Sequence, residues 1–411
     1  MNNNNSALSL DAKVFLHDIE KADILVGIPS FNNVLTASYV LSQVTKGLDT
    51  YFPNLRSVIF VSDGNSKDDT LRSVKKVYLP SQVKLIPAIY MGFSGKGSAV
   101  KAIFEAASTL KVKSVALVDS DLRSITPEWM QLLITPTMTG TGFVAPLYNR
   151  FKYDGTITNF LCYPVTTSLF GKDIRQPIGG DFGLSIELVE DLLDSPIWEL
   201  PDVSRFGIDI FETLTALAKG YSVKQALLGV KNHDAKDPSS QLASMFRQVM
   251  NTMFTCIEQY EPVWREIHGV SKTPMFGEAK YEDTSETIEV SLPATIEAFK
   301  SKYNRYIDIY SSILEQDIQQ KFMQLNQLEN TKVDFPSEIW AKTVYSFIAE
   351  FHKTPTFYRE RLIDALRVLW IGRVAAFLKE TWEMNRQECE EKIVEEAKVF
   401  EKLKPYLIGK Y

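Results

Sequence analysis

Residues 114–121 read Ser-Val-Ala-Leu-Val-Asp-Ser-Asp, a short apolar run that ends in two carboxylates one residue apart. The run from Ser114 to Val118 predicts a buried strand. Ligands of open α/β sheets bind beyond the carboxyl ends of the strands, which is where Asp119 and Asp121 fall. Alternation along a strand would send both acids to one side, toward a divalent cation and the diphosphate that it neutralises. Two solvated turn residues would give the same pattern, so the neighbouring loops are needed to distinguish a turn from a metal site.

The first half of the chain predicts a mostly parallel sheet. Short apolar runs alternate there with helical patterns, and the runs predicted as strands are residues 24–28, 57–61, 83–89, 114–118, 142–147 and 223–228. Repetition of strand, helix and strand at this spacing is typical of a sheet that is covered by helices on both faces.

The last third of the chain predicts only helices. From about residue 292 apolar residues recur at helical spacing, as in Trp340, Val344 and Phe347. Residues 270–291 contain few apolar residues and are typical of a linker. A chain of 411 residues also exceeds what one hydrophobic core usually serves. We therefore expect a disordered leading segment 1–20, an α/β domain 21–269, a linker 270–291 and a helical domain 292–411.

Composition excludes several classes of function. The chain is 45% hydrophobic and 23% charged, as globular proteins are. A net charge of -6 and a pI near 5.5 argue against a nucleic-acid partner. The three cysteines are odd in number and lie far apart, which fits neither a disulfide framework nor a zinc cluster. We expect a protein of the reducing cytoplasm.

The sequence predicts neither a signal peptide nor a membrane span. Residues 1–6 are polar and lack a basic region and an apolar core. Residues 363–378 are too short and too charged to cross a bilayer, because they contain Asp364, Arg367 and Arg373. We expect them to form a packed helix. Residues 386–404 alternate Glu with Lys and Arg, which indicates a solvated helix face.

Polar loops follow the first two predicted strands. In Pro29-Ser30-Phe31-Asn32-Asn33 the proline ends the strand, and the polar side chains can cap the next helix while they face the ligand edge. In Asp63-Gly64 a carboxylate at a strand end is followed by a glycine for a tight turn, so Asp63 could bind a base or a ribose. Capping and turn formation alone would also explain both loops.

The segment Gly95-Lys96-Gly97-Ser98 opens a helix after the third strand. The free amides and the positive end of a helix favour an anion, and Lys96 would add charge against a diphosphate. The Gly-x4-Gly-Lys-Ser/Thr spacing is absent, which argues against an ATPase. Four strand ends with nucleotide-compatible chemistry together favour a metal-dependent sugar-nucleotide transferase.

Three downstream segments carry further candidates. In Gly179-Gly180-Asp181 paired glycines let the backbone approach a ligand, and Asp181 can accept hydrogen bonds from sugar hydroxyls. Asp209 stands at the start of a predicted helix. His233 follows the strand 223–228 and could complete a metal shell, although an isolated histidine is more often structural.

In their order along the chain these motifs resemble those of the retaining GT-A glycosyltransferases that make glucosyl-3-phosphoglycerate, and more distantly the mannosylglycerate synthases. The likeness covers roughly residues 20–260. Besides Asp63-Gly64, Gly95-Lys96-Gly97 and the acidic triad, the family segments Pro-Ala-Leu-Asn-Glu, Pro-Leu-Ala-Gly-Glu, Tyr-Gly-Val-Glu-Ile, Gly-Val-Arg-Ala-His and Met-Ser-Arg-Gln-Val are similar to residues 29–33, 176–181, 206–210, 229–233 and 245–249.

The resemblance implies a GT-A fold, which is a Rossmann-like, mostly parallel sheet, with a helical C-terminal extension. It implies transfer of a hexose from a UDP- or GDP-sugar with retention of configuration, and a homodimer. Metal ligands for Mg²⁺ or Mn²⁺ would be Asp121, His233 and Asp119. The donor would contact Pro29, Ser30, Asn32, Asp63, Lys96, Asp119, Ser120, Asp121 and Gly180, and the catalytic residues would be Asp209, Asp181 and Lys96.

The predicted acceptor site departs from the family pattern. Where the family has Gly-Arg-Val-Thr, this chain has Gly-Thr-Ile-Thr, so Thr158 remains but Thr156 replaces an arginine. A threonine cannot replace a guanidinium as a phosphate clamp. We therefore expect a less phosphorylated acceptor such as glycerate, with 3-phosphoglycerate as the other candidate if Arg150 or Lys152 compensates. Lys231, which also replaces a family arginine, is a further acceptor candidate.

Two other functions stay open on the sequence. One is a transferase that acts on a lipid phosphate or a polysaccharide at a membrane surface and docks through its C-terminal helices. The other is a sugar-nucleotide binder without catalysis, which the intact acids and the histidine argue against.

Overall fold

The computed structural model describes residues 6–232, 242–279, 290–327 and 335–411. The chain divides into two compact units, a first unit of residues 1–150, 175–234 and 273–284 and a second unit of residues 151–174, 235–272 and 285–411. This division differs from the predicted one, because two helices from the middle of the chain pack with the C-terminal helices instead of with the sheet. They are α6 (Tyr163–Phe170) and α9 (Ala243–Gln259).

The described residues of the first unit form an eight-stranded sheet in the order β10-β8-β5-β7-β4-β1-β2-β3. β7 is antiparallel to both neighbours, and the other pairs are parallel. The α/β fold class with a mostly parallel sheet is therefore confirmed. The strands are β1 (Ile24–Ser30), β2 (Ser57–Asp63), β3 (Val83–Ile89), β4 (Ser114–Leu117), β5 (Phe143–Asn149), β7 (Gly183–Ser185), β8 (Val223–Val230) and β10 (Met275–Phe276).

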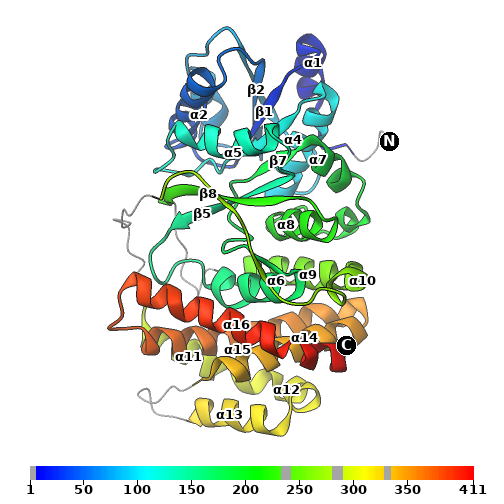
Figure 1. The fold of residues 1–411 in the computed structure, drawn as a ribbon, viewed down its shortest axis with the longest axis vertical. Coiled ribbons are helices and arrows are strands. Elements are labelled where there is room, and N and C mark those ends of the chain that lie inside the picture. The colour runs from blue at the N-terminus through cyan, green and yellow to red at the C-terminus, as the bar shows by residue number, and fades with distance from the viewer. Residues whose placement is uncertain (1–5, 233–241, 280–289, 328–334) are drawn as a thin grey trace. The chain divides into compact units, whose positions relative to one another are not determined.

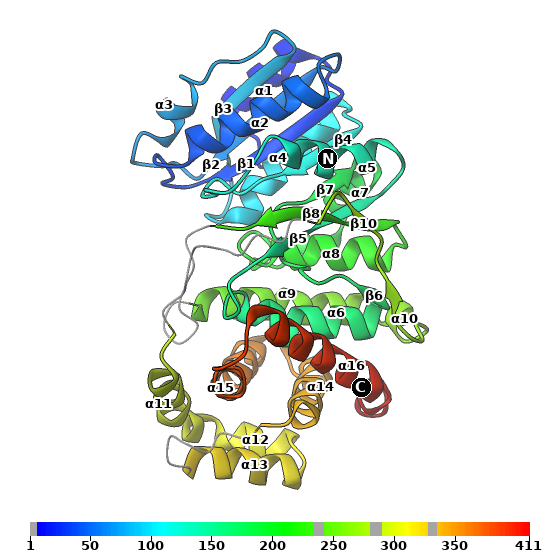
Figure 2. The ribbon, with the colours of Figure 1, turned by 60° about the vertical axis from the view of Figure 1, so that its left-hand side comes forward.

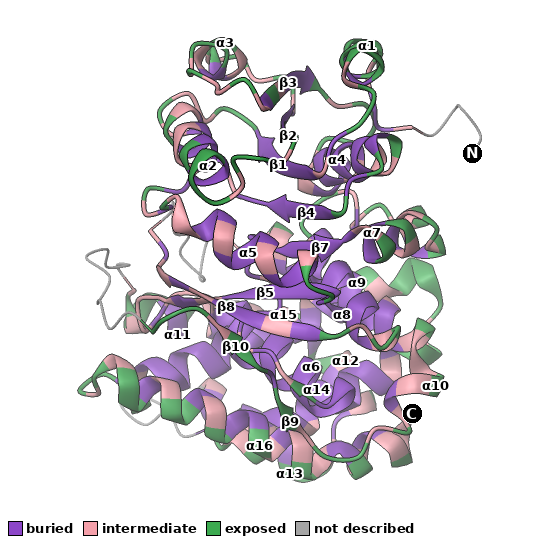
Figure 3. Ribbon diagram, turned by 45° about the horizontal axis from the view of Figure 1, so that its top comes forward, coloured by how far each residue is buried: buried purple, intermediate pink, exposed green. Residues whose placement is uncertain are grey.

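Helices cover both faces of this sheet (Figure 3). On one face lie α2 (Ala37–Tyr51), α3 (Thr70–Val74) and α5 (Glu128–Met138); on the other lie α1 (Leu10–Ile19), α4 (Lys96–Leu110) and α7 (Ile186–Leu193), with α8 (Ile208–Ala218) packed on α4 and α7. β1 is buried along its whole length, as a central strand between two helical layers must be. A Cβ on Gly27 of β1 would lie 2.5 Å from the side chain of Ile103, so this glycine lets α4 approach the sheet closely.

The leading segment is not wholly disordered, in contrast to the prediction for residues 1–20. Helix α1 has Ser9 as its N-cap, whose hydroxyl accepts a hydrogen bond from the amide of Ala12. Ser6 donates to the carboxylate of Glu105 on α4, and the amide of Ala7 donates to the same group. These contacts and the buried Leu16 attach the segment to the first unit.

The second unit is almost entirely helical (Figures 1 and 2). Helix α16 packs against α6 and α14, while α15 packs against α9 and α11. The predicted helical structure from residue 292 onward is thus confirmed for the described residues. A two-stranded sheet and a π-helix that runs into α6 complete the unit. Besides α6 and α9 its elements are the π-helix Thr158–Cys162, β6 (Lys172–Asp173), α10 (Glu261–Trp264), β9 (Ser271–Lys272), α11 (Leu292–Tyr303), α12 (Ile307–Ile313), α13 (Gln316–Gln327), α14 (Ser337–Lys353), α15 (Thr356–Glu380) and α16 (Arg386–Lys410).

Residues 363–378 lie within α15 and are mostly buried, so the predicted packed helix is confirmed. No helix in the described ranges is long and apolar enough to span a bilayer. Helix α16 begins with a capping box between Asn385 and Glu388. Only its outer face is solvated, because Glu396 is buried against Arg373 of α15 at 2.6 Å. The charged residues of 386–404 otherwise form the predicted solvated face, and Glu396 and Lys404 are the buried exceptions among them.

Candidate functional site

The loops after β1 and β2 are tied together at the carboxyl edge of the sheet. Ser30 and Asp63 are paired in the β-ladder, and the Ser30 hydroxyl donates to Asp63 Oδ2 at 2.8 Å. Ser66 adds two hydrogen bonds, from its amide to Oδ1 and from its hydroxyl to Oδ2, each 2.7 Å long. Asp63 is only 1% exposed. Its carboxylate therefore holds the two loops together, and its predicted contact with a base or ribose would have to displace these bonds.

Two asparagines extend this loop network. Asn32 has a φ of 55°, and its backbone N–H donates to the Ser66 hydroxyl at 2.8 Å. Asn33 Oδ1 accepts a hydrogen bond from the Ser120 hydroxyl at 2.8 Å. The structure thus brings four predicted donor-site residues of three separate loops into one network: Ser30, Asn32, Asp63 and Ser120.

The acidic triad lies in a turn and not in a strand. β4 ends at Leu117, two residues before Asp119, so alternation along a strand does not set the direction of the two acids. Instead, the amide of Asp119 donates to Asp181 Oδ1 at 2.8 Å, and the carbonyl of Ser120 accepts from the Thr36 hydroxyl at 2.7 Å. Asp121 is half-buried. Loop contacts therefore position the triad.

Two lysines hold the first acid of the triad between them. Lys96 Nζ lies 2.8 Å from Asp119 Oδ1 and 3.1 Å from Asp209 Oδ1. Lys231 Nζ lies 3.0 Å from Asp119 Oδ2 and 2.8 Å from Asp181 Oδ2. Burial by itself would raise the pKa of Asp119, but the two ammonium groups outweigh it and hold that pKa below the ordinary value. We call these five residues the Lys–Asp cluster.

The cluster has an accessible and a buried layer. The side chains of Lys96, Asp209 and Asp119 are 14%, 15% and 23% exposed, whereas those of Lys231 and Asp181 are 4% and 0% exposed. A ligand that reaches this edge of the sheet therefore meets the first three groups. The other two stand behind them.

Asp181 is fully engaged by the protein. Its Oδ1 accepts the amide of Asp119, and its Oδ2 accepts both Lys231 Nζ and the hydroxyl of Tyr148. Burial and the Asp181 charge raise the pKa of Tyr148 well above its ordinary value, so the phenol stays neutral and donates. Lys231, predicted to contact the acceptor, also donates to the carbonyl of Gly179 at 2.8 Å. Both residues therefore support Asp119 in this structure.

Gly180 lies against Asp119 and Lys96 of the cluster. Its φ is +88°, and a Cβ there would lie 2.6 Å from Asp119 Oδ2 and 2.9 Å from Lys96 Nζ. The close approach predicted for this glycine is thus made to protein side chains.

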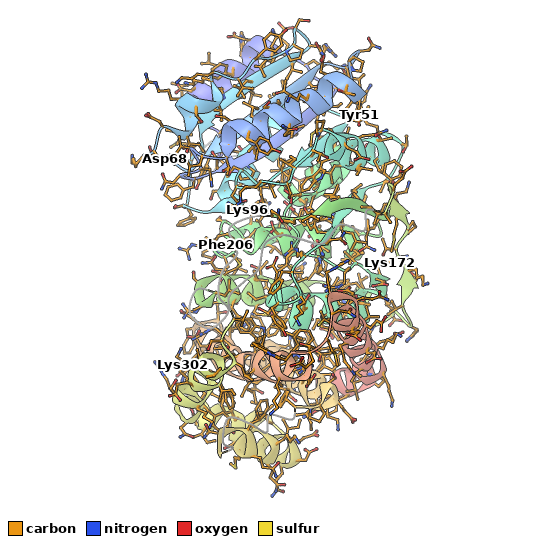
Figure 4. The ribbon with its side chains drawn as sticks, turned by 90° about the vertical axis from the view of Figure 1, so that its left-hand side faces the viewer. Tyr51, Asp68, Lys96, Lys172, Phe206 and Lys302 are labelled. Atoms are coloured by element: carbon orange, nitrogen blue, oxygen red, sulfur yellow. The ribbon has the colours of Figure 1, made fainter. Side chains whose placement is uncertain are left out.

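The N-terminus of α4 differs from the expectation of free amides. The amides of Gly97 and Ser98 donate to the carbonyls of Arg205 and Ser204, each at 3.0 Å. A Cβ on Gly97 would lie 1.8 Å from the carbonyl oxygen of Val203, so glycine is required for this approach. These two amides are satisfied by the segment before α8, and Figure 4 shows the labelled Lys96 and Phe206 in the same region. Of the groups predicted to bind an anion here, the Lys96 side chain remains partly accessible.

Helix α8 contributes a second acid that sequence reasoning missed. Glu212 lies one helical turn after Asp209 and is completely buried, and neither of its carboxyl oxygens has a hydrogen-bond partner. Burial, followed by the charge of Asp209, raises the pKa of Glu212 well above its ordinary value. The one signal for it in the sequence is a glutamate inside an otherwise apolar helix. Tyr148 was also missed, because a tyrosine in a strand gives no signal.

The predicted acceptor residues are divided between the two units. Arg150 belongs to the first unit, where its guanidinium lies 5.3 Å from the ring centre of Tyr148. Thr156 and Thr158 belong to the second unit and are 3% and 4% exposed. Lys152 Nζ donates to three backbone carbonyls after α15, those of residues 381, 382 and 384, which makes it a helix cap.

His233, the predicted metal ligand, lies outside the described residues. Within the described ranges no three His, Cys, Asp or Glu side chains form a group that could hold a metal ion. Asp119, one of the three predicted ligands, is paired with two lysines; the other two are Asp121, with oxygen donors, and His233, with a nitrogen donor. So small a set fits Mg²⁺ or a similar ion, which commonly takes one or two protein carboxylates together with substrate phosphates.

Neither a protein-family model nor a curated protein matches the chain. Among solved structures it is similar to glucosyl-3-phosphoglycerate synthase of Mycobacterium tuberculosis. The complex of that enzyme with Mn²⁺, UDP and phosphoglyceric acid is 22% identical and has a TM-score of 0.46, over 59% of this chain and 82% of that chain. Its complex with Mn²⁺, UDP-glucose and glycerol 3-phosphate is 21% identical and has a TM-score of 0.45, over 62% and 86%.

These solved structures are of glucosyl-3-phosphoglycerate synthase, the enzyme whose family motifs the sequence resembles.

Proposed function

We propose that this protein transfers a hexose from a UDP- or GDP-sugar to a small polar acceptor, with retention of configuration. The observation that carries the proposal is the Lys–Asp cluster at the carboxyl edge of a mostly parallel sheet, where open α/β sheets bind nucleotides. The ordered motifs of the sequence support the same conclusion.

Lys96 is the group proposed to meet the donor diphosphate. Burial would lower the pKa of Lys96, but Asp119 and Asp209 outweigh it and raise that pKa well above the ordinary value, so the side chain is charged. Its ammonium has three N–H donors, and the two acids occupy two of them. The remaining donor can bind a phosphate oxygen, and a diphosphate that takes a second donor would do so in place of Asp209; both contacts would stabilise the negative charge that develops on the leaving diphosphate.

Asp209 is the group proposed to face the transferred sugar. It is held by Lys96 at 3.1 Å and remains partly accessible. A carboxylate in this position can accept hydrogen bonds from sugar hydroxyls and orient the ring.

The metal of the proposal is Mg²⁺ or Mn²⁺, held by Asp121 and His233. Bound there, it would neutralise part of the diphosphate charge as a Lewis acid. Asp119 is a weaker candidate ligand, because both of its carboxylate oxygens already accept from lysines.

The proposed reaction uses no protein nucleophile. Asp181 has no accessible oxygen, and Asp209 is the group proposed to accept hydrogen bonds from the sugar hydroxyls. The acceptor hydroxyl would enter on the face that the diphosphate leaves, and a leaving-group oxygen would take its proton. This differs from retaining glycosidases, whose two carboxylates form and resolve a covalent intermediate.

The proposed acceptor is glycerate or a molecule like it, because Thr156 offers no charge for a phosphate. The alternative acceptor is 3-phosphoglycerate, with Arg150 as the compensating cation. A homodimer in the cytoplasm completes the proposal. The odd number and wide spacing of the three cysteines, all of them buried, support that location.

The test is a thermal-shift screen of UDP-glucose, GDP-glucose and GDP-mannose with and without Mn²⁺, followed by mass detection of products with glycerate and 3-phosphoglycerate. We expect one donor to raise the Tm and to yield a glycosylated acceptor. Donor binding without any product would favour a non-catalytic binder. Product only with vesicle-borne lipid phosphate would favour the membrane-surface transferase.

A further inference from the structure

Glu212 is a buried acid of the first unit for which the proposed reaction has no use. It is 0% exposed, and both of its carboxyl oxygens are without a hydrogen-bond partner. Buried polar groups in folded proteins are nearly always hydrogen-bonded, because an unmade bond costs stability. A glutamate that is buried without a hydrogen-bond partner indicates a second state of the protein in which its carboxyl group has one.

The charges around Glu212 determine whether it is protonated. The charges that act on it are those of Asp209 on its own helix, Lys96 of α4 and Asp119 of the loop after β4. Lys96, the cation among them, already serves the other two acids at 3.1 Å and 2.8 Å. An ionised Glu212 would therefore be a buried charge without a counterion, which proteins avoid by keeping the proton. Glu212 is a neutral acid with an unused O–H donor.

Position makes Asp209 the natural acceptor of that donor. Residues three apart on a helix are neighbours, with Cβ atoms about 5–6 Å apart, a separation that a glutamate side chain can span. In the structure Lys96 Nζ already contacts Asp209 at 3.1 Å, which offsets part of the rise that burial causes in the pKa of Asp209. A diphosphate that takes more than one N–H of Lys96 leaves Asp209 without its counterion.

We propose that Glu212 is a positioning residue that donates its O–H to the Asp209 carboxylate when a donor diphosphate engages Lys96. This rests on the proposed function and deepens it. One proton is then shared between two carboxyl groups, as in other close carboxyl pairs, and no proton is gained or lost by the site. Asp209 keeps its orientation toward the sugar while Lys96 serves the leaving group.

Three variants test the proposal. E212M has a similar volume but no polar group, E212Q keeps an N–H donor and cannot ionise, and T252V removes another fully buried, unpartnered group, the Thr252 hydroxyl of the second unit. Calorimetry with UDP and with GDP measures the nucleotide affinity, and the Tm reports the fold.

We expect the better nucleotide to bind E212M about 10-fold more weakly than the wild-type protein, the size of one lost hydrogen bond to a charged group. E212Q should restore the affinity, and T252V should leave it unchanged. The Tm of E212M should equal or exceed that of the wild type, because the variant removes an unsatisfied buried group. A purely structural role would lower affinity and Tm together.

Equal nucleotide affinity in E212M and wild type would overturn the proposal, as would a loss of affinity in E212Q as large as in E212M. If the wild type binds neither UDP nor GDP, the proposed function fails first and takes this inference with it. Should E212M not fold, the Tm of E212Q decides. The wild type should lose Tm relative to E212Q as the pH rises from 5 to 8, because Glu212 releases its proton only on unfolding. A difference that does not change with pH would contradict the neutral acid.

Discussion

Asp181 holds Asp119 through the backbone: its Oδ1 accepts the Asp119 amide at 2.8 Å, while its Oδ2 takes Lys231 and the Tyr148 hydroxyl. The orientation of the accessible acid is therefore set by a fully buried one. Charge that faces a ligand is thus fixed before the ligand arrives, which is what electrostatic stabilisation of a leaving group requires.

Removing the Tyr148 hydroxyl should show how much its hydrogen bond to Asp181 contributes to stability, apart from the charge of Asp181. Y148F deletes one hydrogen bond to Asp181 and leaves all charges in place, so we expect a loss of about 1–3 kcal/mol in the free energy of unfolding. D181N deletes the charge and leaves Lys231 with fewer buried partners, so we expect a loss of about 3 kcal/mol or more. Urea unfolding of both variants measures the difference. Equal losses would mean that the charge of Asp181 adds nothing to stability beyond its hydrogen bond with Tyr148.

Asp119 gives a prediction about pH. Its folded pKa lies below the unfolded value of about 3.9, so its ion pairs contribute fully above that value and are lost as the pH falls through the folded pKa. D119N should be less stable than the wild type by about 2 kcal/mol at pH 7, somewhat below the range for fully buried pairs because Asp119 is 23% exposed. Urea unfolding from pH 7 to pH 3 should show a constant gap down to about pH 4 and a narrowing gap below it. A gap that widens with acid would contradict the lowered pKa.

Much of the first unit follows from local sequence. The six predicted strands are all present, because runs of β-branched and apolar residues at strand length have few alternative structures. β7 and β10 are three and two residues long, too short for any periodic signal. The division into units was not predictable in the same way. α6 is buried at every position and so resembles a helix beneath a sheet, although it packs on α16.

The candidate site was predictable as a set of loops but not as a set of contacts. Motif order brought Lys96, Asp119, Asp181 and Asp209 into one site, and the structure places them in one cluster. The sequence does not determine which acid each lysine contacts, because this depends on small differences in distance between loops that are far apart in sequence. For the same reason the segment Gly95-Lys96-Gly97-Ser98 could not predict that the amides of α4 are capped by the carbonyls before α8.

That capping predicts a severe effect of one methyl group. In G97A the new Cβ would lie 1.8 Å from the carbonyl oxygen of Val203, so residues 203–205 must move away from α4. We expect a loss of about 2–3 kcal/mol in the free energy of unfolding, as for overpacking with lost backbone hydrogen bonds. G409A is the matched control, since nothing lies within 4 Å of its Cβ and alanine favours a helix. Urea unfolding should find G409A neutral or slightly more stable, and a neutral G97A would disprove the close contact.

Metal dependence gives a prediction at Asp121. D121A should lose most of the Tm increase that Mn²⁺ adds in the presence of UDP, because a site with few protein ligands cannot spare a carboxylate. Its Tm without ligands should stay near that of the wild type, since Asp121 is half-buried and lies in a loop. Differential scanning fluorimetry with EDTA as the metal-free reference checks both points. An unchanged response to Mn²⁺ would remove Asp121 from the metal site.

The buried ion pair of the second unit predicts a compensating double variant. Arg373 Nη2 lies 2.6 Å from Glu396 Oε2, Nε adds a second bond to the same oxygen, and the side chains are 4% and 1% exposed. R373M leaves a buried carboxylate without its cation, so we expect a loss of about 3–5 kcal/mol in the free energy of unfolding. R373M/E396M removes both charges and fills the space with apolar groups, so it should recover most or all of that loss.

Urea unfolding of the two single variants, E396M among them, and the double variant forms a double-mutant cycle. The exposed pair of Arg361 and Asp308 is the matched control: R361M should change stability by less than about 1 kcal/mol. If the double variant is as unstable as R373M, then removing both charges together does not restore stability. The pair would then stabilise the fold by more than each charge compensating the other. In that case α15 and α16 depend on its geometry, since the two hydrogen bonds to Glu396 Oε2 would then fix the register of the two helices.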